Sequence, residues 1–183
     1  KNSCVENFCA AWIFIDNGRW KGVPFLIKAG KKLDKNEVLI RVVFRDSGSC
    51  LFCGGNIAHE NNSLTFRLSP GQGLELDFNA KVPGSRMCMG PMKMEFSYEK
   101  AFPNFREDGY ENVILDCMLG DKTIFWSMEG VKSAWKLLDP VIRKWESCSV
   151  SEKSRAMFMY EPGSKGPDEA EAFMGGGGTG RMA

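Results

Sequence analysis

The 183 residues carry 24 basic and 23 acidic side chains, a net charge of +1, with 43% hydrophobic and 26% charged residues. This balance provides no general attraction to nucleic acid or to a membrane surface. No apolar run approaches the ~20 residues that a bilayer-crossing helix needs, and the length suits one well-packed domain.

Short apolar or alternating runs fill the first hundred residues and predict β-strands joined by turns. Residues 8–15 are apolar throughout, whereas residues 63–68 and 74–78 alternate apolar and polar side chains. The predicted strands are residues 8–15, 23–28, 37–45, 51–52, 63–68, 74–78 and 92–98. Because their connections are too short for crossover helices, we expect mainly antiparallel pairing.

The apolar period changes after Gly109 and predicts helices. One apolar face recurs at three- and four-residue spacing through Tyr110, Val113, Ile114, Cys117 and Met118, and ends at Gly120. Cys117 should lie on this apolar face as a small hydrophobe. A second helix should follow Ser127 as its N-cap and bend at Pro140.

The remaining residues complete a predicted α+β domain. Residues 147–154 are polar and predict a surface connection, and residues 167–173 predict a last short helix. We expect a large, mostly antiparallel β-sheet with helices packed on one face. This domain should cover residues 1–174, followed by a flexible glycine-rich tail at residues 175–183.

Basic residues gather at predicted strand ends next to glycine turns. Lys31 follows Gly30, where a backbone without Cβ can approach a ligand while the ammonium meets an anion. On an extended chain, Lys31 and Lys32 would point in opposite directions. The basic set comprises Lys28, Lys31, Lys32, Lys35, Arg41 and Arg67. It can form an anion pocket, or a solvated strand edge that resists aggregation.

The cysteines and the single histidine leave a metal site open as an alternative. Cys50, Cys53 and His59 supply half of a tetrahedral zinc site, but no second matched pair follows. Seven cysteines without a paired framework favour reduced thiols. A cytoplasmic location is expected, or the plastid stroma if a transit segment precedes Lys1. No nucleophile elbow, phosphate loop or dinucleotide fingerprint is present, so we expect no nucleotide-binding domain within this chain.

The stretch from Arg19 to Leu33 resembles RWxGVPFxxxxGKxL, the segment that opens the C-terminal domain of glucose-6-phosphate dehydrogenase. Further similarities follow in family order. They are residues 10–20 with an Ala-Ala pair before the IDNxRW turn, 64–70 with LxIRxQP, 81–84 with KxPG, 109–116 with AYExLxLD, 135–140 with WxxxxP and 160–167 with YxxGSxGP. Nearly the whole chain therefore resembles this one domain.

The resemblance implies a domain that binds substrate and forms a dimer or a dimer of dimers. The full enzyme would oxidise glucose 6-phosphate to 6-phosphogluconolactone with NADP in the pentose phosphate pathway, using a coenzyme domain that precedes this segment. The catalytic histidine would also lie in that preceding part, so the resemblance implies no catalytic residue in this chain. Lys31, Lys35 and Ser69 match or adjoin substrate-binding positions, although Ser69 replaces a glutamine. Basic positions of a second, structural NADP site match Lys28, Arg41, Arg67 and Lys165. Glu75 and Asp77 stand where members with that second site carry tyrosine and lysine.

Three hypotheses follow from the residues and the resemblance. The chain is the C-terminal part of a working dehydrogenase, inactive when alone, whose partners are the substrate and the coenzyme domain. Alternatively, it is a non-catalytic homologue or fragment that serves as a dimerisation or ligand-binding module. The third hypothesis is a zinc-dependent interaction domain.

Overall fold

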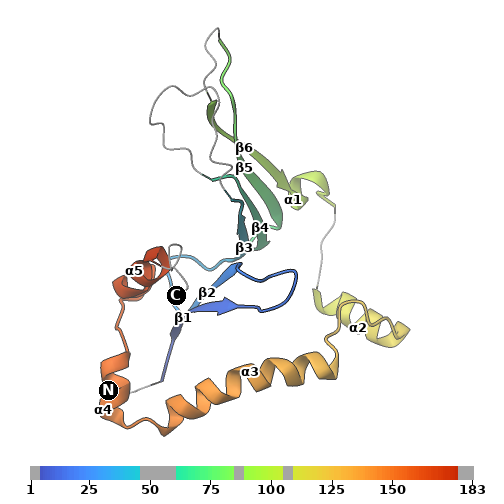
Figure 1. Cartoon of the computed structure of the whole chain (residues 1–183). Coiled ribbons are helices and arrows are strands. Elements are labelled where there is room, and N and C mark those ends of the chain that lie inside the picture. Colours follow the sequence, from blue (N-terminus) through green and yellow to red (C-terminus); the bar gives the residue numbers. More distant parts are fainter. Residues whose placement is uncertain (1–4, 46–60, 85–88, 105–108, 177–183) are drawn as a thin grey trace. The chain divides into compact units, whose positions relative to one another are not determined.

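The computed structural model describes residues 5–45, 61–84, 89–104 and 109–176, which form two compact units (Figure 1). Unit 1 combines residues 1–35 with residues 110–183, and unit 2 is the continuous stretch 36–109. Antiparallel strands occur together with helices, which confirms the α+β class. The described strands belong to a four-stranded and a two-stranded sheet rather than to one large sheet.

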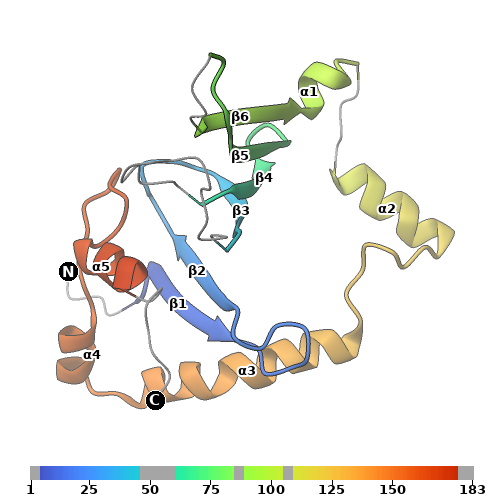
Figure 2. The ribbon, with the colours of Figure 1, turned by 45° about the horizontal axis from the view of Figure 1, so that its top comes forward.

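Unit 2 is built on an antiparallel sheet in the order β3-β4-β5-β6 (Figure 2). Its strands are β3 Val38–Val43, β4 Ser63–Ser69, β5 Gly73–Lys81 and β6 Met89–Ser97. The helix α1, Tyr98–Ala101, follows β6 directly, with the Ser97 hydroxyl accepting a hydrogen bond from the Lys100 N–H. The sequential order of the strands confirms the antiparallel pairing predicted from short connections.

The strand register gives this sheet two unlike faces. One cross-strand row consists of Arg41, Thr65, Glu75 and Glu95. The next row, on the opposite face, consists of Ile40, Phe66, Leu74 and Phe96. At the two edges of the apolar row, Ile40 is 54% and Phe96 is 40% exposed. The alternation read from the sequence therefore separates an ion-pairing face from an apolar face whose edge residues are exposed.

Unit 1 contains an antiparallel hairpin of β1, Phe8–Phe14, and β2, Pro24–Gly30. Its register runs from the Phe8–Gly30 pair to the Phe14–Pro24 pair. In the connecting loop, Asn17 Oδ1 accepts hydrogen bonds from the backbone N–H groups of Arg19 and Trp20 at 3.1 and 2.8 Å. An asparagine side chain that bonds the backbone two residues on is a recurrent turn-forming device. The predicted turn is thereby confirmed.

The helices are α2 Gly109–Leu119, α3 Met128–Ser147, α4 Val150–Ala156 and α5 Asp168–Gly176. The Ser127 hydroxyl caps α3 by accepting a hydrogen bond from the Gly130 N–H, as predicted, and α3 continues past Pro140 to Ser147. Two expectations were wrong. The polar residues 147–154 contain most of α4 because Ser149 and Glu152 form a capping box. Cys117 is exposed, since α2 has no buried residue.

Several expectations fall outside the structure or stay predictions. The strand at residues 51–52 and the zinc candidates Cys50, Cys53 and His59 lie outside the described residues. The packing of helices against one face of the sheet stays a prediction. α5 extends to Gly176, two residues beyond the predicted end of the domain. Among the described helices, none is long and apolar enough to cross a membrane.

Candidate functional site

The predicted substrate and coenzyme residues are divided between the two units. Unit 1 contains Lys28, Lys31, Lys35 and Lys165, whereas unit 2 contains Arg41, Arg67 and Ser69. Each group has its own local structure, and the two groups differ in how their charges are already paired.

The turn after β2 holds Lys31 by its backbone. Its N–H donates to the Asn7 carbonyl at 2.9 Å, one residue beyond the last register pair of the hairpin. The Lys31 carbonyl accepts a hydrogen bond from the Tyr160 hydroxyl at 2.7 Å. Lys32 then adopts φ 54°, a left-handed conformation. The expectation of an extended chain through Lys31 and Lys32 was therefore wrong: the chain turns sharply at Lys32 because it docks against a distant segment.

That distant segment, residues 160–166, is called the Tyr160 segment below. Its Gly163 N–H donates to the Lys32 carbonyl at 2.8 Å, and its Ser164 carbonyl accepts from the Asp34 N–H at 2.9 Å. Lys165 lies within it and is exposed. The turn after β2 and the Tyr160 segment therefore form one hydrogen-bonded surface that presents lysines from both.

Phe8 fills the space behind this surface. Its ring meets the Tyr160 ring edge-on with centroids 5.7 Å apart, and the Lys28 ammonium lies 5.9 Å from its centroid. A Cβ on Gly30 would lie 2.8 Å from the Phe8 ring, and one on Gly166 would lie 2.5 Å from it. Close packing against Phe8 therefore explains why both positions are glycine. This includes Gly30, where the sequence suggested that the missing Cβ would let a ligand approach.

The lysines of this surface are available to an anion. Lys31, Lys32, Lys35 and Lys165 are all exposed. Among the described residues, none of these four ammonium groups has an ion pair within 4 Å. Several unpaired cations on two joined segments suit a doubly charged ligand such as a phosphate monoester.

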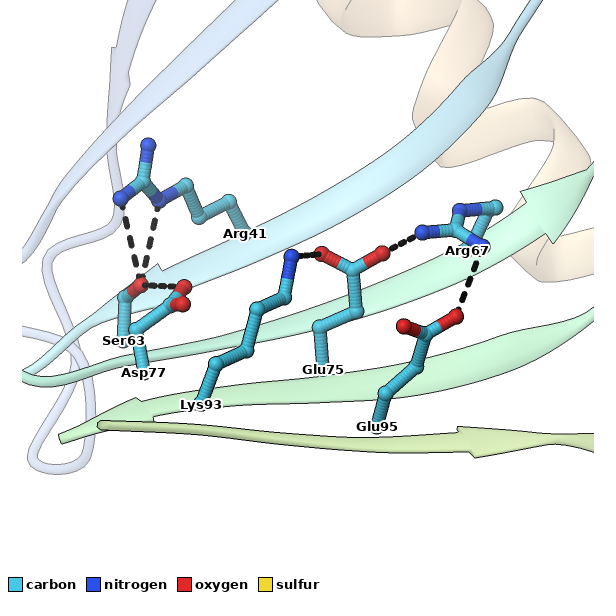
Figure 3. Close-up of polar contacts among 7 residues, drawn as sticks. All are labelled: Arg41, Ser63, Arg67, Glu75, Asp77, Lys93 and Glu95. Atoms are coloured by element: carbon cyan, nitrogen blue, oxygen red, sulfur yellow. Dashed lines mark hydrogen bonds and ion pairs between the residues drawn. The ribbon is translucent and has the colours of Figure 1, made fainter.

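Arg41, on the polar face of unit 2, is already engaged by neighbouring side chains (Figure 3). Its Nε and Nη2 donate to the Ser63 hydroxyl at 3.3 and 3.2 Å. Ser63 is fully buried and donates in turn to Asp77 Oδ2 at 3.1 Å. An anion that reached Arg41 would therefore meet the Asp77 carboxylate close by.

Arg67 is paired on the same face (Figure 3). It forms an ion pair with Glu75 and lies 4.0 Å from a Glu95 oxygen. The other Glu75 oxygen is 2.7 Å from Lys93 Nζ, and the Glu75 side chain is only 14% exposed. Two basic and two acidic side chains thus neutralise one another locally.

Ser69 lies at the end of β4, where it pairs with Val38 of β3 and is exposed. Its hydroxyl can donate and accept a hydrogen bond at the sheet edge. Ser69 belongs to unit 2, whereas Lys31 and Lys35 belong to unit 1.

The roles of Tyr160, Ser63 and Lys93 were not predicted from the sequence. Alternation along β6 could have placed Lys93 on the same face as Glu75, because both occupy polar positions of adjacent strands. The contact of Tyr160 with Lys31 gave no comparable signal, since the two residues are 129 positions apart in the sequence. Among the described residues, no three histidine, cysteine or acidic side chains are grouped to hold a metal ion.

Comparisons with known proteins agree across the chain. The family model described as glucose-6-phosphate dehydrogenase, C-terminal domain, matches residues 1–180. A curated relative from Chlamydia trachomatis, glucose-6-phosphate 1-dehydrogenase, is 41% identical over 177 residues, covering 94% of this chain and 39% of its own length. The enzyme of the same name from Borreliella burgdorferi is 33% identical over 173 residues, covering 94% of this chain and 34% of its own length.

Solved structures give the same result. A glucose-6-phosphate dehydrogenase in complex with its substrate glucose-6-phosphate matches with a TM-score of 0.84 and 28% identity, over 100% of this chain and 36% of that one. Glucose-6-phosphate 1-dehydrogenase from Mycobacterium avium matches with a TM-score of 0.72 and 26% identity, over 93% of this chain and 34% of that one. The chain thus spans well under half the length of these relatives.

Proposed function

Because this chain belongs to the glucose-6-phosphate dehydrogenase C-terminal domain family, we propose that it is the C-terminal part of a working glucose-6-phosphate dehydrogenase. The complete enzyme would oxidise carbon 1 of glucose 6-phosphate to the lactone. NADP, held mainly by the part of the enzyme outside this chain, would accept the hydride. The observation that carries this proposal is the exposed lysine surface around Lys31, within a chain that matches the family over residues 1–180.

In this proposal, the chain binds and orients the substrate. The phosphate monoester carries nearly two negative charges at neutral pH, and exposed ammonium groups meet it as point charges. Lys31 is the main phosphate ligand, and Lys35 adds positive charge four residues further along. Ser69 of unit 2 matches a substrate-binding position of the family, and its hydroxyl can donate or accept a hydrogen bond. Proton transfer from the substrate belongs to the preceding part of the enzyme.

The second, structural NADP site fits this chain only in part. Lys28 and Lys165 are exposed. Arg67 is neutralised by Glu75, and Arg41 donates to a serine that is bonded to Asp77. A dinucleotide phosphate at either arginine would have to displace or approach these carboxylates, at an electrostatic cost. We therefore assign no dinucleotide to the polar face of unit 2.

The proposed partners are the coenzyme domain of the same enzyme and a second copy of it. The open apolar face of the four-stranded sheet supports an interface, because large exposed apolar patches mark contact surfaces. Met92 and Met94 add to this face and are 53% and 60% exposed. Analytical ultracentrifugation of the full-length enzyme should show a dimer or a dimer of dimers. A monomer at tens of micromolar, on the order of weak-dimer constants, would contradict this assignment.

The function is tested by Lys31→Ala in the full-length enzyme. The control is Lys21→Ala, which removes an exposed lysine of the β1–β2 loop that is not part of the Lys31 surface and should leave the KM unchanged. Loss of a hydrogen bond to a charged group costs about 1.5–3 kcal/mol, so the KM for glucose 6-phosphate should rise roughly tenfold to a hundredfold. The KM for NADP should stay unchanged. If Lys31→Ala behaves like the wild type, the lysines form only a solvated edge.

The full-length enzyme also distinguishes a dehydrogenase from the alternative function, a non-catalytic module. A non-catalytic ligand-binding module would bind glucose 6-phosphate in calorimetry without reducing NADP. The isolated chain should also fail to reduce NADP, because no proton acceptor or dinucleotide fingerprint was identified in its sequence. NADP reduction by the isolated chain would contradict this division of labour.

A further inference from the structure

Among the described residues, four hydrogen bonds hold the turn that carries Lys31, and one of them comes from a side chain. Three anchors are backbone hydrogen bonds: Lys31 N–H to Asn7, Gly163 N–H to Lys32, and Asp34 N–H to Ser164. The fourth is the Tyr160 hydroxyl, 2.7 Å from the Lys31 carbonyl. Among the described residues, no other side chain bonds the backbone of residues 31–34.

This anchor acts where the backbone needs support. Lys32 has φ 54°, and a residue with a Cβ is disfavoured in that region because its side chain crowds the following carbonyl. The peptide plane between Lys31 and Lys32 carries the carbonyl that Tyr160 bonds. Fixing that plane fixes both the exit direction of the Lys31 side chain and the entry into the left-handed residue.

The Tyr160 hydroxyl is itself held in place. Its ring packs edge-on against Phe8, with ring centroids 5.7 Å apart. The hydroxyl lies 3.2 Å from the Asn7 carbonyl, the same oxygen that accepts the Lys31 N–H. The phenol therefore joins the two residues that flank the open end of the β1–β2 hairpin, Asn7 and Lys31. A rigid ring is a better positioning device than a long flexible side chain.

We propose that Tyr160 is a positioning residue for the substrate phosphate: its hydroxyl fixes the backbone from which the Lys31 ammonium reaches that phosphate. This inference rests on the proposed function, since it assigns the phosphate to Lys31. Tyr160 itself does not touch the substrate. Its effect on binding must therefore pass through Lys31.

The test uses the full-length enzyme with Tyr160→Phe, Lys31→Ala and the double variant. Tyr160→Phe keeps the ring against Phe8 and removes only the hydroxyl. The KM for glucose 6-phosphate should rise about three- to tenfold, the range for one lost hydrogen bond. kcat and the KM for NADP should stay within about twofold of the wild type, as for a change in ground-state binding alone. In the Lys31→Ala background, Tyr160→Phe should have no further effect on KM, because both changes remove one interaction.

A structural readout and a control accompany the kinetics. Hydrogen exchange at the amides of residues 31–34 should become faster in Tyr160→Phe. Tyr98→Phe makes the same chemical change in unit 2, where the Tyr98 ring packs against Phe96 and Phe102, and should leave KM unchanged. If Tyr160→Phe yields no soluble enzyme, Ser164→Ala replaces it, because the Ser164 hydroxyl accepts from Gly166 N–H and shapes the same segment.

The outcomes separate this inference from the proposed function. A Lys31→Ala variant with wild-type KM overturns both. A raised KM in Lys31→Ala together with an unchanged KM in Tyr160→Phe overturns only the positioning role, and faster exchange in that variant then marks Tyr160 as merely structural. Additive effects in the double variant also overturn it, since they place the action of Tyr160 outside Lys31.

Discussion

The ion-pair cluster on the polar face of unit 2 predicts that Glu75→Gln destabilises the protein measurably. Glu75 joins two cations, Arg67 and Lys93, and its side chain is only 14% exposed. A well-solvated ion pair contributes about 0.2–1 kcal/mol, whereas a bond to a charged group with little solvent contributes about 1.5–3 kcal/mol. Arg67 is 35% and Lys93 is 52% exposed, which screens both pairs. We therefore expect a total loss of about 1–2 kcal/mol.

The assay is thermal unfolding of the full-length enzyme followed by circular dichroism. For a domain of this size, about 1–2 kcal/mol corresponds to a Tm lower by roughly 3–6 °C. Glu95→Gln is the matched control, because Glu95 is 48% exposed and lies 4.0 Å from Arg67. Its loss should stay below about 0.5 kcal/mol. Equal Tm values for the two variants, or no change for Glu75→Gln, would refute the assignment of stability to the less exposed carboxylate.

Three further predictions concern the same protein. Gly73→Ala places a Cβ 2.5 Å from a carbonyl oxygen of β6 and should cost about 1–3 kcal/mol in urea unfolding, whereas Gly18→Ala, with nothing within 4 Å, should be nearly neutral. Hydrogen bonds from the Ser149 hydroxyl and backbone N–H lower the pKa of Glu152. The ionised Glu152 carboxylate therefore stabilises α4 fully above the ordinary glutamate pKa of about 4.3. This stabilisation is lost as the pH falls through the lower pKa that Glu152 has in the folded protein. Hydrogen exchange in α4 should therefore accelerate on acidification, and in Ser149→Ala it should already be fast at neutral pH. Glu75→Gln removes the carboxylate that pairs with Arg67 and Lys93, so added NADP should raise the Tm of this variant more than it raises the Tm of the wild type. Equal increases in Tm would contradict the view that Glu75 neutralises these two cations.

Much of unit 2 could be predicted from the sequence because its contacts are local. Residues 63–68 and 74–78 alternate cleanly, and the short turn between them leaves one antiparallel register. The same alternation places Arg41 and Glu75 on one face. It could not show that Ser63 is fully buried, because that burial depends on Arg41 and Asp77 from the two flanking strands.

Unit 1 was harder to predict because its contacts are long-range. The sequence indicated Lys31 as an anion ligand, but the left-handed Lys32 depends on carbonyl and amide partners in the Tyr160 segment. The backbone propensity of a residue, read from its neighbours in the sequence, does not depend on such distant partners. The missed helix α4 is a different case, since its capping box was readable within four residues.

The division of the chain into a continuous unit and a unit built from both ends has a consequence for folding during synthesis. Residues 36–109 leave the ribosome together, and their strands pair with neighbours in sequence, so unit 2 can fold as soon as it emerges. The turn at Lys31 is made earlier but waits for Tyr160, 129 residues later, before its last anchor exists. Closing so long a loop is entropically costly and comes late. The nascent chain therefore acquires its ion-paired sheet before the turn at Lys31 gains its anchor from Tyr160.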